Sequence, residues 1–226
     1  MSKENEKITN EAEKIKKETA ETAKQVKDSV KNVNIKDETK KTKGFVIDMF
    51  KNPLNKLEEI SKDGGTFFKT AIFMIIIWIV AVFIKSTYST IYYWGFSRVF
   101  SNILDVLKNI LVPIISVLVY SLIIFILNKE NKKSLTEIIS VVTATKLPIV
   151  IASIVSILTI FSYEINKLTI AFSSLCNVLT IVLSYFGYKA IFSEKDDKKF
   201  IKKFAIIEII YCVVYVVLTF LGIYIY

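Results

Sequence analysis

Residues 67–84 read FFKTAIFMIIIWIVAVFI, an apolar run of 18 residues in which Lys69 is the only charged side chain. As an α-helix this run would extend about 27 Å, close to the roughly 30 Å thickness of the hydrocarbon layer of a membrane. Lys62 and Asp63 precede the run, and Lys85 follows it. The run therefore predicts a first membrane-spanning helix.

Further apolar stretches continue to the C-terminus, and we predict spans at residues 67–85, 109–127, 138–162, 168–190 and 204–225. The third span is less regular. Ser134 and Glu137 fit a capping box that starts a helix, and Pro148 then removes a backbone donor, so we expect a kink at Pro148. The prediction is an all-α, polytopic membrane helix bundle in which residues 67–226 form five transmembrane helices.

The first 66 residues have another composition, with 15 lysines and 13 acidic residues. We interpret residues 1–42 as a charged, weakly amphipathic cytoplasmic tail and residues 43–66 as an interfacial amphipathic segment. The tail has two interpretations, an amphipathic helical arm on lipid or a partner, or a solvated and mostly disordered tail. Its small apolar area favours the second.

The lysine and arginine residues near the span ends predict the orientation. Three connections, at residues 43–62, 129–146 and 189–203, together contain 14 of these cations, whereas the opposite side has four. Cytoplasmic connections are enriched in such cations. We therefore expect the N-terminus in the cytoplasm and the C-terminus outside.

Several chemistries find no support in the sequence. Histidine is absent, and both cysteines, Cys176 and Cys212, lie in apolar runs. The net charge of +9 is explained by lysines at span ends rather than by nucleic-acid binding. We expect no catalytic, cofactor-binding or metal-binding residues, no cofactor, and no enzyme activity.

One charged pair is a candidate inside the bundle. Glu208 is the only carboxylate within the fifth predicted span, and Lys146 enters the third span from the same side. Paired charges cost less in a membrane than separate ones. We hypothesise that Lys146 and Glu208 approach one another; alternatively, each reaches the headgroups independently.

The fourth predicted span has a face of small and polar residues at helical spacing: Ser173, Asn177, Thr180, Ser184 and Gly187. Small residues let membrane helices approach closely, and hydroxyl groups bond across the contact. The preferred interpretation is a helix-packing face. A polar lining for a small solute is the alternative.

Three short motifs resemble the Yip family of Ypt/Rab-interacting membrane proteins: Lys-Asn-Pro-Leu at 51–54, Leu-Val-Pro-Ile at 111–114 before a lysine-rich link, and Thr-Ala-Thr-Lys-Leu-Pro at 143–148. The resemblance would extend over residues 43–226. It implies a bacterial-type member with five spans, located in a bacterial cell membrane. For that group it implies a fold and a location rather than an assigned activity.

We expect a non-enzymatic membrane-organising or partner-binding scaffold, with a small transporter or transporter subunit as the alternative. Its expected partners are the lipid bilayer, anionic headgroups at the Lys-rich tail and links, and a protein partner or second copy of the chain. Nucleic acid is not expected.

Overall fold

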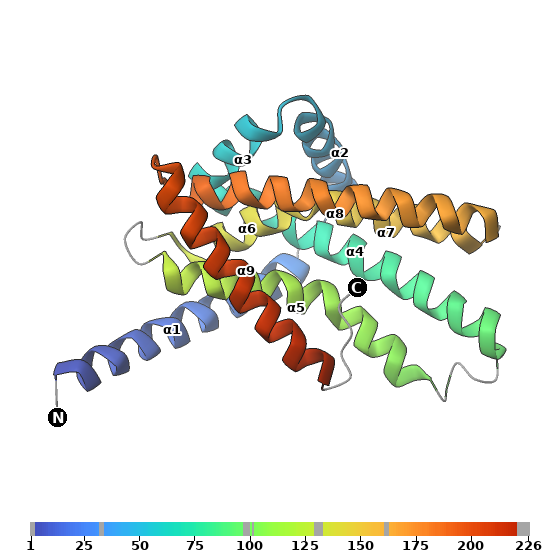
Figure 1. Cartoon of the computed structure of the whole chain (residues 1–226), viewed down its shortest axis with the longest axis horizontal. Helices are drawn as coiled ribbons and strands as arrows, with labels where there is room; N and C mark the ends of the chain where they lie inside the picture. The colour runs from blue at the N-terminus through green and yellow to red at the C-terminus, as the bar shows by residue number, and fades with distance from the viewer. Residues whose placement is uncertain are drawn as a thin grey trace.

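The computed structural model describes the backbone of residues 3–31, 34–96, 100, 102–128, 133–160 and 163–220, and no strand occurs among them. The helices pack side by side, with α9 crossing α5 and with α2 and α3 on one flank (Figure 1). In chain order they are α1 Lys3–Lys31, α2 Ile35–Lys51, α3 Pro53–Lys62, α4 Gly64–Trp94, α5 Ile103–Leu127, α6 Leu135–Thr145, α7 Leu147–Val155, the 3-10 helix η2 Ser156–Ile160, α8 Tyr163–Phe192 and α9 Asp197–Phe220.

The predicted all-α membrane bundle is confirmed. Within the described residues, four helices are long and apolar enough to cross a membrane: Gly64–Tyr92, Ile103–Leu127, Ile165–Phe192 and Asp197–Phe220. Leu135–Thr145 and Leu147–Thr159 together form a fifth candidate span, bent by 48°. The last residues of the predicted third and fifth spans, 161–162 and 221–225, lie outside the described part of the chain.

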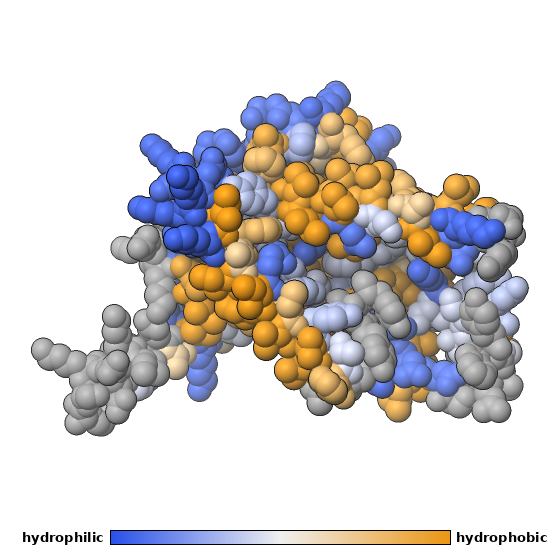
Figure 2. Space-filling model, in the orientation of Figure 1, coloured by the Kyte–Doolittle hydropathy of each residue, from blue (hydrophilic) through white to orange (hydrophobic). Residues whose placement is uncertain are grey.

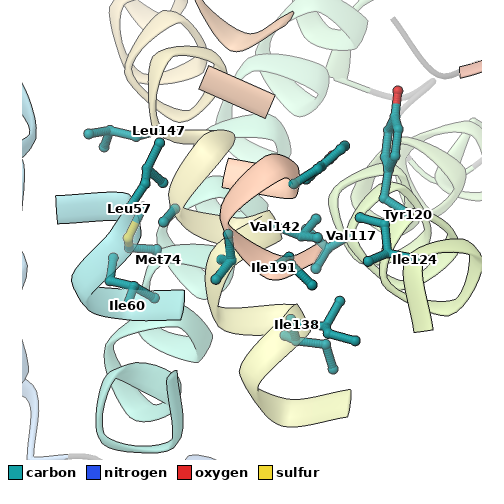
Figure 3. Packing of buried hydrophobic residues seen from close by; sticks show 14 of the residues in the cluster. Leu57, Ile60, Met74, Val117, Tyr120, Ile124, Ile138, Val142, Leu147 and Ile191 are labelled. Carbon is teal, nitrogen blue, oxygen red and sulfur yellow. The ribbon is translucent and has the colours of Figure 1, made fainter. Parts of the chain in front are cut away.

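Helix α6 lies at the centre of the bundle. It packs against α3, α4, α5 and α8, and every one of its residues except Glu137 is buried. In Figure 3, Ile138 and Val142 of α6 lie between Leu57 of α3 on one side and Ile124 of α5 on the other. The apolar core of the protein is therefore organised around one short helix.

The predicted capping box at the start of α6 is confirmed. The Ser134 Oγ accepts a hydrogen bond from the Glu137 backbone N–H at 3.3 Å, and the Ser134 N–H donates to the Glu137 carboxylate at 2.9 Å. At the other end, α6 stops at Thr145 and α7 resumes with Pro148 in its first turn. A proline there suits the start of a new helix, because its missing N–H would have no partner in the first turn.

Helix α4 extends beyond residue 85, the end of the predicted first span. Helix α4 continues through the tyrosine-rich residues to Trp94, where Gly95 ends it with φ +79° and donates its N–H to the Ile91 carbonyl at 2.9 Å. No glycine or proline occurs earlier in that stretch to stop the helix. The tyrosines therefore extend the helix, and Tyr88 stacks on Tyr92 with ring centroids 6.1 Å apart.

Helices α2 and α3 form a bent pair on the flank of the bundle. Asn34 caps α2 and Asn52 caps α3, each through a side-chain oxygen that accepts a backbone N–H at 3.4 Å. Because of the cap at Asn34, α2 crosses the predicted boundary at residue 42. The buried Glu38 carboxylate fastens α2 to α4 by accepting a hydrogen bond from Thr70 at 3.1 Å, and its hydrogen bond from Lys41 raises the pKa of that lysine.

The N-terminal tail, for which the sequence favours disorder, forms helix α1 and packs against α4 and α6. Its inward side is made partly of small polar residues, since Thr22 and Ser29 are buried and Val26 is half-buried. Small polar residues do not add to the periodic pattern of apolar residues that marks the buried side of a helix. The sequence therefore does not indicate which side of α1 contacts the bundle.

The link between α8 and α9 is held by two ion pairs. Lys189 pairs with Asp197, and Lys203 pairs with Glu194 at 3.1 Å, a contact that lowers the pKa of the Glu194 carboxyl. Beyond the link, α9 turns apolar side chains such as Val213 and Phe220 outward, and an apolar surface follows α9 in Figure 2. An outward apolar surface on a spanning helix fits contact with lipid tails.

Candidate functional site

Lys146 lies at the break between α6 and α7, and its side chain is buried in the bundle with 5% exposure. Its ammonium group is 4.0 Å from the centroid of the Tyr120 ring on α5. A cation over an aromatic face is stabilised by the negative charge density of the ring. The Tyr120 ring therefore provides part of the compensation that this buried charge requires.

Tyr120 also contacts Glu208 on α9. Its hydroxyl donates a hydrogen bond to the Glu208 carboxylate at 2.9 Å, and its ring stacks on Tyr211 with centroids 3.9 Å apart. Tyr188 of α8 lies 5.9 Å from the same ring. We call Lys146, Tyr120, Glu208, Tyr188 and Tyr211 the tyrosine cluster; it joins the α6–α7 break, α5, α8 and α9.

The structure thus brings Lys146 and Glu208 to the same tyrosine, one at the face of the ring and one at the hydroxyl. No ion pair within 4.0 Å joins them among the described side chains. The sequence contains no signal for Tyr120 as a shared contact, because helical periodicity says nothing about which helices become neighbours. The electrostatic pairing of Lys146 and Glu208 stays a prediction.

The predicted polar face of α8 divides into two parts. Near the C-terminal end of α8, Thr180 and Ser184 are buried, and Ser184 donates a hydrogen bond to Thr145 at 3.4 Å. A Cβ added at Gly187 would lie 2.6 Å from the Thr145 Cγ2, so α8 and α6 approach one another where a side chain has no room. This part of the face packs helices together.

The other part of the face, Ser173 and Asn177, lines a cavity of about 610 Å³. The cavity lies where α4 ends and α5 begins, with α7, η2 and α8 around it. The end of α4 and the beginning of α5 lie on the right in Figure 1. It is lined by Trp78, Val82, Lys85, Ser86, Ser89, Thr90, Asp105, Asn109, Val112, Ile149, Ala152, Ser153, Ser156, Ser173 and Asn177. Its volume falls within the range of about 300–1,000 Å³ typical of small-molecule sites.

The cavity lining carries two opposite charges, Lys85 and Asp105, which do not pair with one another. Asp105 interacts instead with Lys108, at 3.4 Å through one carboxylate oxygen. In the same lining, the Asn109 amide donates a hydrogen bond to Ser86 at 2.9 Å and holds α5 against α4. The sequence offered Ser173 and Asn177 as part of a polar face, but it contained no sign that Lys85 and Asp105 face the same space.

The described residues provide no metal site, since no group of three or more His, Cys, Asp or Glu side chains gathers among them. Cys176 is buried and Cys212 is exposed, and both are free thiols. The chemistry that the described groups support is binding of charged and polar groups, through the cavity, together with stabilisation of buried charge in the tyrosine cluster.

Comparison with known families identifies the family of the chain. The family model described as the Yip1 domain matches residues 47–223, which is most of the chain and includes both the tyrosine cluster and the cavity. No curated protein and no solved structure shows significant similarity to the chain.

Proposed function

The chain belongs to the Yip1 domain family, a family of multi-span membrane proteins not known as enzymes, and from this premise we propose that it is a membrane-organising scaffold. The scaffold acts by holding lipid headgroups and partner proteins at the surfaces of its amphipathic helices and of its basic α8–α9 link. With the orientation expected from the lysine distribution, these surfaces lie on the cytoplasmic side of a bacterial cell membrane.

The observation that carries the proposal is the outward face of α2 and α3. While Phe45, Met49 and Leu57 are buried against the bundle, Phe50 is 72% exposed and Leu54 is 43% exposed. Both exposed residues flank the turn at Asn52, and lysines such as Lys51 and Lys56 lie around it. An exposed apolar face bordered by lysines is typical of a helix that lies at a membrane interface.

A second surface supports the same proposal. Four lysines at the α8–α9 link are exposed and have no ion-pair partner among the described residues: Lys195, Lys198, Lys199 and Lys202. Hydrophilic residues cover that corner of the molecule in Figure 2. A lysine near an anionic leaflet contributes about 1 kcal/mol to its attraction.

Replacing these four lysines with glutamine should lower the preference of the reconstituted protein for anionic lipid by at least about tenfold, because up to about 1 kcal/mol is lost per lysine and about 1.4 kcal/mol is a factor of ten. Association of spin-labelled phosphatidylglycerol and phosphatidylcholine with the protein surface measures this preference. Arginine at the same four positions keeps the charge and should keep the preference. An unchanged preference in the glutamine variant would contradict the proposed role of the link.

A nitroxide label at Phe50→Cys should be accessible to oxygen and shielded from a polar nickel reagent in liposomes, because the proposal places this face in lipid. The matched control is Glu58→Cys on the exposed side of α3, which should show the opposite pattern. Both variants are made with Cys176 and Cys212 replaced by alanine. Nickel accessibility at position 50 equal to that at position 58 would count against an interfacial α2–α3 pair.

A small transporter or transporter subunit is the second candidate, and the cavity is the observation that favours it. The two candidates differ in one measurable property. Flux of a solute through liposomes that contain the purified protein would select the transporter, whereas a scaffold binds without flux.

A further inference from the structure

The cavity near the α4–α5 connection has a chemical composition that indicates a class of ligand. Lys85 supplies a cation, and no hydrogen bond or ion pair to it occurs among the described residues. Asp105 supplies an anion, and Lys108 occupies only its Oδ1. The cavity therefore contains a cation without a partner among the described residues and an anion with one carboxylate oxygen left unpaired.

Several neutral polar groups in the cavity also have no partner among the described residues. Ser89, Ser173 and Asn177 line the cavity. The two serine hydroxyls and the Asn177 amide form no hydrogen bond with the described residues. Polar groups within a membrane protein are costly unless water or a ligand satisfies them. This end of the bundle therefore offers hydrogen-bond donors as well as opposite charges.

The cavity lining also contains apolar side chains. Trp78 and Val82 of α4, Val112 of α5 and Ile149 of α7 belong to this apolar part of the lining. A free ion would gain little from these side chains, whereas a headgroup attached to a glycerol and acyl chains would bury its apolar part against them. The lining therefore combines charged, neutral polar and apolar side chains, a combination that matches an amphipathic molecule.

We propose that this cavity binds a zwitterionic phosphodiester of the phosphoethanolamine class, with Lys85 facing the phosphate and Asp105 facing the ammonium group. Two sources supply this chemistry, the headgroup of an aminophospholipid and a soluble glycerophosphodiester; the apolar lining favours the lipid. The inference is independent of the scaffold role. Loss of ligand binding would leave the lipid preference of the α8–α9 link unchanged, so the two proposals fail separately.

The test uses the full-length protein in detergent with Trp94→Phe, which leaves Trp78 in the cavity wall as the only tryptophan. The probes are glycerophosphoethanolamine, which has both charges, and ethanolamine and glycerol 3-phosphate, which have one each. We expect saturable changes in Trp78 fluorescence and calorimetric heat, with the zwitterion at least about tenfold tighter than either fragment.

Lys85→Gln and Asp105→Asn should each weaken glycerophosphoethanolamine binding about tenfold, as expected for loss of one charge-assisted contact. Lys69→Gln is the matched control, since Lys69 lies on the same helix as Lys85 but outside the cavity lining, and the substitution removes the same charge. Thermal unfolding of each variant shows whether the fold is retained. Equal affinity of folded Lys85→Gln and the unsubstituted protein would overturn the proposal.

Intact lipids separate the two sources. In nanodiscs, tighter binding of phosphatidylethanolamine than of phosphatidylglycerol, lost in Lys85→Gln, would assign the site to a lipid headgroup. Binding of glycerophosphoethanolamine without any such lipid preference would support the site and assign it to the soluble diester. Absence of saturable binding in both fluorescence and calorimetry, for every probe, would overturn the proposal.

Discussion

Replacing Gly64 with alanine is expected to destabilise the protein by about 2 kcal/mol, while the same change at the neighbouring Gly65 is expected to have no destabilising effect. A Cβ at Gly64 would lie 2.7 Å from the Cα of Glu137 and 3.0 Å from its carbonyl oxygen. These are backbone atoms of the central helix α6, so a rotamer change cannot relieve the clash. Helices α4 and α6 would have to separate.

The contact at Gly64 also includes a hydrogen bond. The Ser140 hydroxyl of α6 donates to the Gly64 carbonyl at 2.7 Å, so separation of the helices would weaken this bond too. At Gly65, by contrast, an added Cβ would meet nothing within 4 Å. Alanine there should stabilise the helix by up to about 1 kcal/mol, because glycine loses more backbone freedom on folding.

Thermal unfolding in detergent, followed by the fluorescence of the buried Trp78, measures both variants. For a chain of this size, about 2 kcal/mol corresponds to an unfolding temperature lower by roughly 4–8 °C. Equal unfolding temperatures for the two alanine variants would show that the close approach of α4 to α6 is absent from the protein in solution.

The second large effect concerns the tyrosine cluster, where we expect Glu208→Gln to destabilise the protein by about 2 kcal/mol. Glutamine can still accept the hydrogen bond of Tyr120, so the change removes the charge and keeps the contact. Lys146 would then remain buried with the Tyr120 ring as its only charge compensation in the cluster. Breaking a fully buried ion pair costs about 3–5 kcal/mol. We expect a smaller loss of stability here because Glu208 is only half-buried.

A double-mutant cycle tests whether Lys146 and Glu208 act as an electrostatic pair. Lys146→Met removes the buried cation, and the double variant with Glu208→Gln should be more stable than the sum of the single effects by at least about 1 kcal/mol. Tyr215→Phe on the exposed side of α9 is the control for changes on that helix. Strictly additive effects would mean that the two charges are compensated independently.

The multi-span architecture follows from composition, because runs such as 67–84 are long enough to cross a bilayer and lack the charges that would prevent it. The start of α6 was also readable, since a capping box is a local pattern. The residues with the most specific roles could not be predicted from the sequence. Tyr120, Gly64 and Asp105 act through helices distant in the sequence, and periodicity identifies a face without identifying its neighbour.

The α2–α3 pair shows the same limit within one short segment. The sequence predicts an amphipathic segment at residues 43–66, and two of its apolar residues, Phe50 and Leu54, are exposed while Leu57 is buried. Phe45 and Met49 bind the pair to the bundle. Apolar residues occur on more than one side of α2, so spacing could not decide which side would face the protein.

The enclosure of α6 has a consequence for biogenesis. A helix wrapped by α3, α4, α5 and α8 has little contact with acyl chains in the finished protein. In the two-stage description of membrane protein folding, spans first enter the bilayer and then associate. Substitutions on α6 should therefore leave translocon-mediated integration of the flanking spans intact and impair their later assembly, yielding integrated but unassembled chains.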